Sequence, residues 1–273
     1  MTPDALFGLS GKSALVTGGA TGVGRMAAEG LVAAGARVFI ASRKEEACEA
    51  AADDLNAAGY SGRAEGFGGD VATEQGIDAL AAEIGNRTEQ LDILMNNAGT
   101  SWGTPLGEFP YFAWERVMQL NVTGLFHLTQ KLLPLLETAA SDDDPARVVN
   151  VGSVMGELPH GDRAYSYAAS KAAVHHLTKI LAKELADRRI TVNALAPGPF
   201  VSKMTAFATE DEQVRSRVGA QVPLGRVGRR EDIAAALQYL CGRGGAYVTG
   251  AILPISGGIN VETGPDLFQE AYA

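Results

Sequence analysis

The stretch SALVTGGATGVG, Ser13 to Gly24, joins a short apolar run to a glycine-rich turn, and a helical pattern of apolar residues begins directly after it. The run from Ser13 to Thr17 has the length and composition of a buried strand. Glycines at a strand-to-helix turn let the backbone reverse tightly and approach a pyrophosphate, whose charge then lies at the helix N-terminus. The stretch therefore predicts a dinucleotide-binding loop, and its candidate residues are Gly18, Thr21, Gly22, Val23 and Gly24.

The spacing of this loop, G-x-x-x-G-x-G, departs from the commoner G-x-G-x-x-G pattern and indicates a subclass of dinucleotide folds. An ordinary glycine-rich turn is the alternative interpretation. The position of the loop, in the first of many strand-and-helix units, favours the phosphate loop over that alternative.

Short apolar runs alternate with longer segments of helical period along the rest of the chain. Further strands are expected at 37–41, 91–95, 147–152, 190–196 and 251–255, with a weaker one at 63–67. Expected helices include 23–34, 44–58, 114–137, 167–187 and 231–241. This alternation predicts an α/β fold, a doubly wound parallel sheet of about seven strands with helices on both faces. Pro134 should kink or end its helix.

The composition sets limits on the class of protein. A chain of 273 residues with 46% hydrophobic content can bury a core, and without a flexible linker or internal repeat it is expected to form one domain over residues 1–273. Its net charge is −9 and it has no run of Lys and Arg, so neither nucleic acid nor membrane is an expected partner. No signal segment or membrane-crossing run is evident, and Cys48 and Cys241 lie far apart, which predicts a cytoplasmic protein with reduced thiols.

A second stretch, YSYAASK from Tyr165 to Lys171, contains a candidate catalytic pair. Tyr167 and Lys171 are four residues apart and would share one face of a helix. An ammonium beside a phenol favours the phenolate and lowers the phenol pKa. Taken alone, the pair could equally be an amphipathic surface contact with a solvated charge.

The stretch ASRK, residues 41–44, bears on the choice of cofactor. Ser42 stands near the position where a dinucleotide fold that prefers NAD places a carboxylate for the ribose 2′-hydroxyl. Arg43 and Lys44 follow, and two cations suit a 2′-phosphate. NADPH is therefore favoured over NADH. The alternative is that Arg43 and Lys44 only begin a solvated helix.

Six sequence features then occur in a fixed order: TGGATGVG, NNAG (Asn96 to Gly99), Asn121 in LNV, Ser153 in NVGS, Tyr167 with Lys171, and Pro197-Gly198. Together they resemble the short-chain dehydrogenase/reductase family from about Leu9 to about Asn260. Within that family, NNAGTSWG and PARVVNVGSV resemble the rhamnolipid-type 3-oxoacyl-[acyl-carrier-protein] reductases. The resemblance implies a Rossmann-like fold and an NADP(H)-dependent enzyme that interconverts a small-molecule carbonyl and alcohol, assembled as a homotetramer or homodimer.

The resemblance also implies roles for individual residues. Tyr167 would protonate the carbonyl oxygen, or act as the base in the alcohol direction. Lys171 would lower the pKa of Tyr167 and bind the nicotinamide ribose, while Ser153 would donate a hydrogen bond to the substrate oxygen. Asn121 would hold a water that links Lys171 to solvent. Tyr165, Ser166 and Ser170 are left as positioning or packing residues.

The remaining cofactor residues are also implied by the resemblance. Asp70 and Val71 would meet the adenine, and Pro197 with Gly198 would place backbone near the nicotinamide carboxamide. The adenosine side would be lined by Asn97, Ala98 and Gly99. Two structural alternatives stay open, a helix cap for Asp70 and a tight turn with a left-handed asparagine at residues 96–97. The histidines lack ligand spacing, so no metal is expected and all four are read as packing or surface residues: His127, His160, His175 and His176.

Loops after the fourth, fifth and sixth strands should form the substrate pocket. Their large apolar residues are Trp102, Met155, Leu158, Phe200, Met204 and Phe207. The segment 199–224 could close as a lid, and the tail 261–273 could cover a neighbouring subunit. Apolar walls suit an acyl chain or a ring better than a free sugar, although the same residues could merely complete the core.

These features favour an NADPH-dependent carbonyl reductase, with 3-oxoacyl thioesters as the first expected substrate. Other ketones, cyclic alcohols or sugars are the alternative substrates. A non-catalytic NADPH-binding regulatory or scaffold subunit is the alternative from another class. The presence of Asn121, Ser153, Tyr167 and Lys171 together argues against it.

Overall fold

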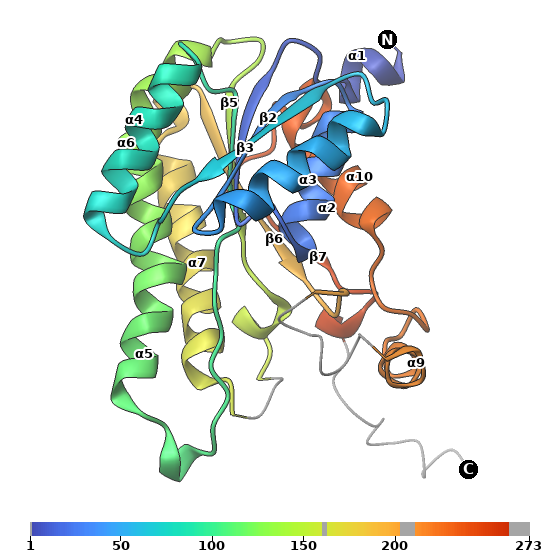
Figure 1. The fold of residues 1–273 in the computed structure, drawn as a ribbon. Helices are drawn as coiled ribbons and strands as arrows, with labels where there is room; N and C mark the ends of the chain where they lie inside the picture. The colour runs from blue at the N-terminus through green and yellow to red at the C-terminus, as the bar shows by residue number, and fades with distance from the viewer. Residues whose placement is uncertain (1, 160–162, 203–210, 262–273) are drawn as a thin grey trace.

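The computed structural model describes residues 2–159, 163–202 and 211–261, and within them seven parallel strands form one sheet (Figure 1). The strand order is β3-β2-β1-β4-β5-β6-β7. The strands are β1 (Ser13–Thr17), β2 (Arg37–Ser42), β3 (Arg63–Gly68), β4 (Ile93–Asn96), β5 (Ala146–Val151), β6 (Ile190–Pro197) and β7 (Ile252–Ile255). The predicted α/β fold with a doubly wound parallel sheet is confirmed.

The strand order reverses between β1 and β4. The chain begins at β1, moves outward through β2 to β3, and then returns to place β4 on the other side of β1, with Leu15 opposite Leu94 and Val16 opposite Met95. Connections on the two sides of this point leave the sheet in opposite directions, which opens a crevice at the carboxyl ends of the strands. The fold thus places the glycine-rich loop after β1 beside that crevice.

Helices cover both faces of the sheet (Figure 1). One face carries α2 (Gly22–Ala33), α3 (Glu45–Ala57) and α10 (Arg230–Cys241), and the other carries α4 (Glu74–Arg87), α5 (Tyr111–Met118), α6 (Leu125–Ala139) and α7 (Tyr165–Glu184). Two further helices, α1 (Pro3–Phe7) and α9 (Glu212–Ala220), lie at the periphery. Because side chains alternate along a strand, Val16 and Ile40 enter the core under α2, whereas Leu15 and Phe39 enter the core under α4 and α6.

The structure corrects one local expectation and the second half of another. The helix expected over 114–137 is interrupted by a π-helical turn, η2 (Gln119–Gly124), between α5 and α6. Pro134 does not end its helix, because α6 continues to Ala139. A proline removes one backbone hydrogen bond, but Leu132 and Leu136 are fully buried on either side of it, and this packing holds the helix together.

The chain also bears out the expectation about its thiols, since Cys48 and Cys241 are both buried and unpaired. A search of the described helices found none with the length and apolar character needed to cross a membrane.

A buried arginine ties the sheet to α10 at the amino-terminal end of β5. The Arg147 side chain is 1% exposed. Its guanidinium donates to the carbonyl oxygens of Leu240 and Gly242, both at 3.1 Å, and to Asp144 Oδ1 at 3.0 Å. Burial lowers the pKa of Arg147, and Asp144 acts in the opposite direction. The interaction therefore neutralises a buried charge and satisfies the last carbonyls of α10.

We predict that Arg147→Met lowers the free energy of unfolding by roughly 3 kcal/mol, because two carbonyls lose their donor inside the protein. Urea unfolding followed by circular dichroism measures this difference. The matched control is Arg63→Met, whose side chain is 65% exposed beside Glu65 and which should change stability by less than about 0.5 kcal/mol. Equal midpoints for the two variants would contradict a structural role for Arg147.

Candidate active site

A cavity of about 1890 Å³ opens at the carboxyl ends of the strands, beside the point where the strand order reverses. Loops after β1, β4, β5 and β6 meet there with the start of α7 and the segment that follows α9. Twelve of the predicted site residues line it: Gly18, Thr21, Gly22, Val23, Asn97, Ala98, Gly99, Ser153, Tyr167, Lys171, Pro197 and Gly198. The structure thus brings together residues that lie far apart in the sequence.

The glycine-rich loop has the backbone geometry that its residues predict. Gly18 and Gly22 have φ values of +65° and +56°, in the left-handed region that favours glycine. Gly24 does not line the cavity, but a Cβ atom there would lie 2.4 Å from both Asn97 Nδ2 and Gly18 O. The start of α2 can therefore approach the loop after β4 only without a side chain at Gly24.

Asn97 and Thr17 hold the loops after β1 and β4 together. Asn97 Nδ2 donates to the carbonyl oxygens of Thr17 at 2.8 Å and Gly18 at 3.2 Å. Thr17 Oγ1 accepts from the backbone nitrogens of Asn97 at 3.1 Å and Ala98 at 3.0 Å. The sequence analysis missed Thr17. Its position at the end of a strand that would neighbour β4 is the signal that could have identified it.

The alternative of a left-handed asparagine turn after β4 is wrong. In the described residues, positive φ values outside glycine occur at Arg163 and Arg189 alone. Asn96 is the last residue of β4, and its side chain donates to Thr129 Oγ1 and Asn150 Oδ1, both at 3.0 Å. Asn96 therefore belongs to a buried polar network beneath the site.

The residues predicted to receive a 2′-phosphate lie at the end of β2 and the start of α3, outside the cavity wall. Ser42 Oγ accepts from the backbone nitrogen of Lys44 at 3.3 Å and lies 3.0 Å from Cys48 Sγ. Arg43 and Lys44 are exposed, and neither forms an ion pair within the described residues. Both cations are thus available to an anion at this edge.

Asp70 and Val71 also lie outside the cavity wall, before α4. Asp70 Oδ1 accepts from the backbone nitrogen of Ala72 at 2.9 Å, but Thr73 is the N-cap of α4, so the cap alternative for Asp70 is wrong. Val71 is buried, and a Cβ atom on Gly124 would lie 2.1 Å from its carbonyl oxygen. Close backbone packing there connects the turn before α4 to the π-helical turn.

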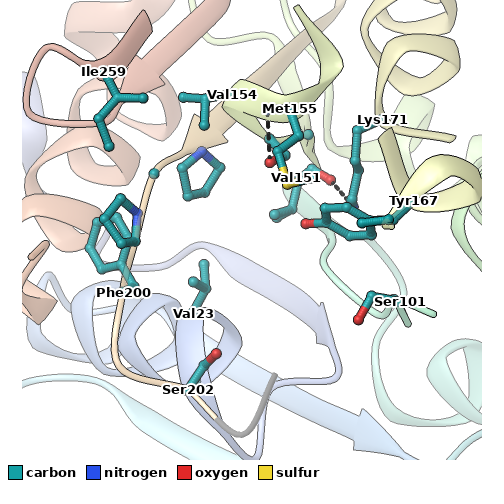
Figure 2. A pocket seen from close by; sticks show the side chains of 18 of the residues that line it. Val23, Ser101, Val151, Val154, Met155, Tyr167, Lys171, Phe200, Ser202 and Ile259 are labelled. Carbon is teal, nitrogen blue, oxygen red and sulfur yellow. Dashed lines mark hydrogen bonds between the residues drawn. The ribbon is translucent and has the colours of Figure 1, made fainter. Parts of the chain in front are cut away.

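Tyr167 and Lys171 lie on one face of α7, as their spacing predicts. Figure 2 shows the Tyr167 hydroxyl pointing into the cavity, with Lys171 behind it on the same helix. Lys171 Nζ donates to the Val151 carbonyl oxygen at 2.6 Å and lies 5.5 Å from the centroid of the Tyr167 ring. Burial lowers the pKa of Lys171 to about 8. Its acceptor is a backbone atom at the end of β5, which the sequence could not identify.

The expected effect of Lys171 on Tyr167 is not what the structure shows. Burial raises the pKa of the Tyr167 phenol above its usual value, and a hydrogen bond with Ser153 offsets part of that rise. Lys171 makes no comparable contribution, because its ammonium is directed to Val151 and lies over the ring rather than at the hydroxyl. In this arrangement Tyr167 is a protonated phenol at neutral pH.

Ser153 follows β5 and caps a short 3₁₀ turn, η3 (Val154–Gly156). The side chain is 6% exposed, and its Oγ accepts from the backbone nitrogen of Met155 at 3.2 Å. This contact leaves the hydroxyl proton free to be shared with the Tyr167 oxygen or with a bound carbonyl.

Asn121 lies in the π-helical turn and is 1% exposed, so it does not form part of the cavity wall. Its Nδ2 donates to the Thr100 carbonyl oxygen and to Ser170 Oγ, both at 2.9 Å, and its Oδ1 accepts from the Thr100 nitrogen at 2.8 Å. Ser170 Oγ in turn donates to the Tyr167 carbonyl oxygen at 2.7 Å. The Asn121 side chain thereby joins the loop after β4 to the helix that carries Tyr167.

The neighbouring residues agree with a packing or positioning role. Tyr165 packs edge-on against Phe109 with centroids 5.8 Å apart, and Ser166 is fully buried. His127 and His176 are exposed, whereas His175 is buried; His160 lies outside the described residues. No group of three or more His, Cys, Asp or Glu side chains that could hold a metal ion was found among the residues that the structure describes.

The substrate side of the cavity is mainly apolar (Figure 2). Of the predicted wall residues, Trp102, Met155, Leu158 and Phe200 line it, while Met204 and Phe207 lie outside the described residues. The Trp102 ring packs edge-on against Phe112 with centroids 5.3 Å apart. Further apolar wall residues that sequence reasoning did not single out include Val151, Val154, Val218, Val222 and Ile259. Val218 and Val222 fall within the segment predicted to act as a lid.

Comparison with known proteins agrees with this geometry. The family model described as short chain dehydrogenase matches residues 12–213. The rhamnolipids biosynthesis 3-oxoacyl-[acyl-carrier-protein] reductase of Pseudomonas aeruginosa is 49% identical, over 93% of this chain and 98% of its own. The 3-oxoacyl-[acyl-carrier-protein] reductase FabG of Aquifex aeolicus is 36% identical, over 92% of this chain and 98% of its own.

A solved structure, the Pseudomonas aeruginosa RhlG/NADP active-site complex, matches with a TM-score of 0.89 and 48% identity, over 95% of this chain and all of that one. The cofactor of that complex is the one expected here from Ser42, Arg43 and Lys44. The match of the family model and the identity to these relatives show that the chain is an oxidoreductase of the short-chain dehydrogenase family.

Proposed function

We propose that this protein is an NADPH-dependent reductase of 3-oxoacyl thioesters. The observation that carries the proposal is the single cavity that joins the glycine-rich loop after β1 to the paired hydroxyls of Tyr167 and Ser153 and to apolar walls. The names of the two similar reductases support the same substrate class.

The described residues fit a dinucleotide. The left-handed glycines Gly18 and Gly22 line the cavity at the N-terminus of α2, where a pyrophosphate would be stabilised, and the missing Cβ at Gly24 lets that helix pack closely against the loop after β4. Arg43 and Lys44, which have no carboxylate partner among the described residues, would receive the 2′-phosphate. The dinucleotide site would be completed by three further groups of residues: Asp70 with Val71 at the adenine, Asn97 to Gly99 on the adenosine side, and Pro197 with Gly198 near the nicotinamide carboxamide. NADPH, when bound, supplies the hydride.

Tyr167 would supply the proton. A phenol whose pKa is raised stays protonated at neutral pH, and this is the form that can donate to the carbonyl oxygen during reduction. Ser153 would donate a second hydrogen bond to that oxygen, where negative charge develops. Both residues line the same cavity, so one oxygen atom of the substrate would reach both hydroxyls.

Lys171 would bind the nicotinamide ribose, as the family resemblance implies. With a pKa of about 8, the ammonium is protonated roughly ten to one at pH 7. Its Nζ donates to the Val151 carbonyl oxygen at 2.6 Å, and this bond holds the ammonium at the cavity wall, 5.5 Å from the centroid of the Tyr167 ring. We retain the proposal that Asn121 also supports a water relay to Lys171, in addition to fixing Ser170.

Apolar exposed residues support the proposed assembly as a homotetramer or homodimer. Ile180 on α7 is 51% exposed and Tyr239 on α10 is 41% exposed. Burial of such side chains between subunits would be favourable. A cytoplasmic location remains our proposal and is supported by the two unpaired thiols.

The substrate class is tested by NADPH oxidation, with NADH in parallel, against acetoacetyl and longer 3-oxoacyl thioesters, cyclic ketones and keto sugars. We expect turnover with NADPH that increases with acyl length, because a longer chain contacts more of the apolar wall. Turnover restricted to rings or sugars would keep the reductase and reject the acyl substrate. NADPH binding without any turnover, including oxidation of secondary alcohols, would favour a regulatory subunit.

We predict that Tyr167→Phe lowers kcat about 10²- to 10⁴-fold and leaves NADPH affinity unchanged, because only the proton donor is lost. Stopped-flow turnover and fluorescence titration of NADPH measure the two effects. Tyr165→Phe is the matched control and should retain activity, since that ring packs against Phe109. A near-normal rate for Tyr167→Phe would remove Tyr167 from the mechanism.

We predict that Arg43→Ala weakens NADPH binding by roughly 1.5–3 kcal/mol and leaves NADH binding nearly unchanged, since one charged hydrogen bond to the 2′-phosphate is lost. Isothermal titration with both cofactors measures the difference. Arg116→Ala, at an exposed position on α5, controls for the general loss of a positive charge. Equal losses for NADPH and NADH would mean that Arg43 is structural.

A further inference from the structure

His175 is the third side chain in a row that includes the two proposed catalytic residues of α7. Tyr167, Lys171 and His175 are spaced by four residues, which places them one above the other on the same helix face. The His175 side chain is 5% exposed. From the sequence His175 was expected to be a packing or surface residue, and its contacts indicate a more specific role.

His175 contacts the turn that carries Ser153. Its Nε2 accepts from the Ser153 backbone nitrogen at 3.4 Å. The other polar atoms of Ser153 bond within the turn, since its carbonyl oxygen accepts from Gly156 at 2.9 Å and its Oγ accepts from Met155 at 3.2 Å. The bond to His175 therefore connects this turn to α7, the helix that carries Tyr167.

The turn is shaped to admit the imidazole ring. A Cβ atom on Gly152 would lie 2.1 Å from His175 Nε2, and one on Gly156 would lie 2.9 Å from His175 Cε1. The ring thus occupies space that two glycines leave open on either side of Ser153. Close contact on both sides limits how far the turn can shift relative to α7.

The contact requires a neutral imidazole, because Nε2 can accept a proton only when it carries none. The proton then lies on Nδ1, which forms no hydrogen bond and is 3.5 Å from Glu157 Oε1. Three charged groups influence the ring, Glu157 from the end of the turn and Lys171 and Lys179 from α7. Burial lowers the pKa of His175, the two lysines act in the same direction, and Glu157 opposes them.

We propose that His175 is a positioning residue, whose neutral imidazole holds the Ser153 turn against α7 so that the Ser153 and Tyr167 hydroxyls meet at one substrate oxygen. The proposal rests on the proposed function in one respect, that both hydroxyls act on the substrate. It assigns His175 no contact with the substrate itself.

The arrangement has a defined dependence on pH. Protonation of Nε2 replaces the acceptor with a donor that faces another donor, the Ser153 nitrogen, so the turn must move away. It also places a second positive charge near Lys171. Since the pKa is lower in the folded state than the ordinary value of about 6.5, the unfolded chain binds the proton more readily. The contribution to stability is therefore fully present above about 6.5 and declines as the pH falls below it, whereas the contact in the folded protein persists until the pH falls through the lower pKa of the folded state.

The test compares His175→Gln with His175→Met in kcat measured from pH 5 to 8 with NADPH and a 3-oxoacyl thioester. Glutamine keeps an acceptor near the place of Nε2 and does not titrate, whereas methionine has a similar shape and no such acceptor. We expect His175→Met to lower kcat about 10- to 100-fold with unchanged NADPH affinity, as misplacement of a reacting group does. His175→Gln should retain activity and lose the decline at acid pH. His176→Gln, an exposed neighbour, is the control.

Wild-type activity in this assay reports on the proposed function, and the ratio of variant to wild type reports on His175. A second measurement does not depend on turnover: the amide resonance of Ser153 in protein labelled with ¹⁵N-serine. We expect it to titrate below pH 6.5 in the wild type and to remain unchanged with pH in His175→Gln. Wild-type kcat in His175→Met, or a Ser153 resonance that does not titrate in the wild type, would overturn the proposal. If His175→Met fails to fold, the pH profile and resonance of His175→Gln decide the question.

Discussion

The pairing of β1 with β4 is the constraint on which the site depends. Hydrogen bonds between these strands bring Ala14 to Val16 beside Ile93 to Met95, residues far apart in the sequence. Without this pairing the glycine-rich loop and the loop after β4 would not meet. The bonds between Thr17 and Asn97 then extend the contact beyond the ends of the strands, and they fix the edge of the cavity where a dinucleotide would lie. The pairing of the strands thus determines where the loops of the site lie.

A buried cation lies near each end of β5, Arg147 on the strand itself and Lys171 on α7, and the two differ in how their charge is compensated. Arg147 bonds to carbonyl oxygens at the end of α10, together with a carboxylate that compensates its charge. Lys171 bonds to the Val151 carbonyl and has no carboxylate partner among the described residues, and its pKa falls to about 8. An uncompensated buried ammonium destabilises the fold, but it leaves Lys171 at the cavity wall as a cation that a bound ligand could contact.

Much of the fold could be predicted because apolar runs and helical periods are local signals. All seven strands were placed within two residues at each end, from Ser13–Thr17 to Ile252–Ile255. The π-helical turn at Gln119–Gly124 has no such signal, since its residues continue the helical period, and packing against Val71 decides its geometry. Pro134 was predicted to kink or end α6. It does not end the helix, because the buried leucines outweigh one lost hydrogen bond, and the kink stays a prediction.

The candidate site likewise contains residues that could be identified from the sequence and contacts that could not. Tyr167, Lys171 and Ser153 could be identified from residue type, spacing and family resemblance. The acceptor of Lys171 is a backbone carbonyl, and the partner of Ser153 is a histidine that the sequence analysis read only as a packing or surface residue. Contacts between elements that are distant in sequence determine both. The raised pKa of Tyr167 depends on burial, which the spacing of Tyr167 and Lys171 does not reveal.

The cavity is lined by residues from Gly18 to Ile259, almost the full span of the chain. During synthesis, therefore, no partial chain that ends before β7 contains the complete cavity, although β1 and its glycine-rich loop are made first. A ligand stabilises only the states that bind it, so a substrate that needs the complete cavity cannot assist folding before the last strand has joined the sheet. Parallel pairing between distant segments is also slow to form. The emerging chain must rely on local contacts, such as those of α2 and α3 on β1 and β2, until the whole sheet is assembled.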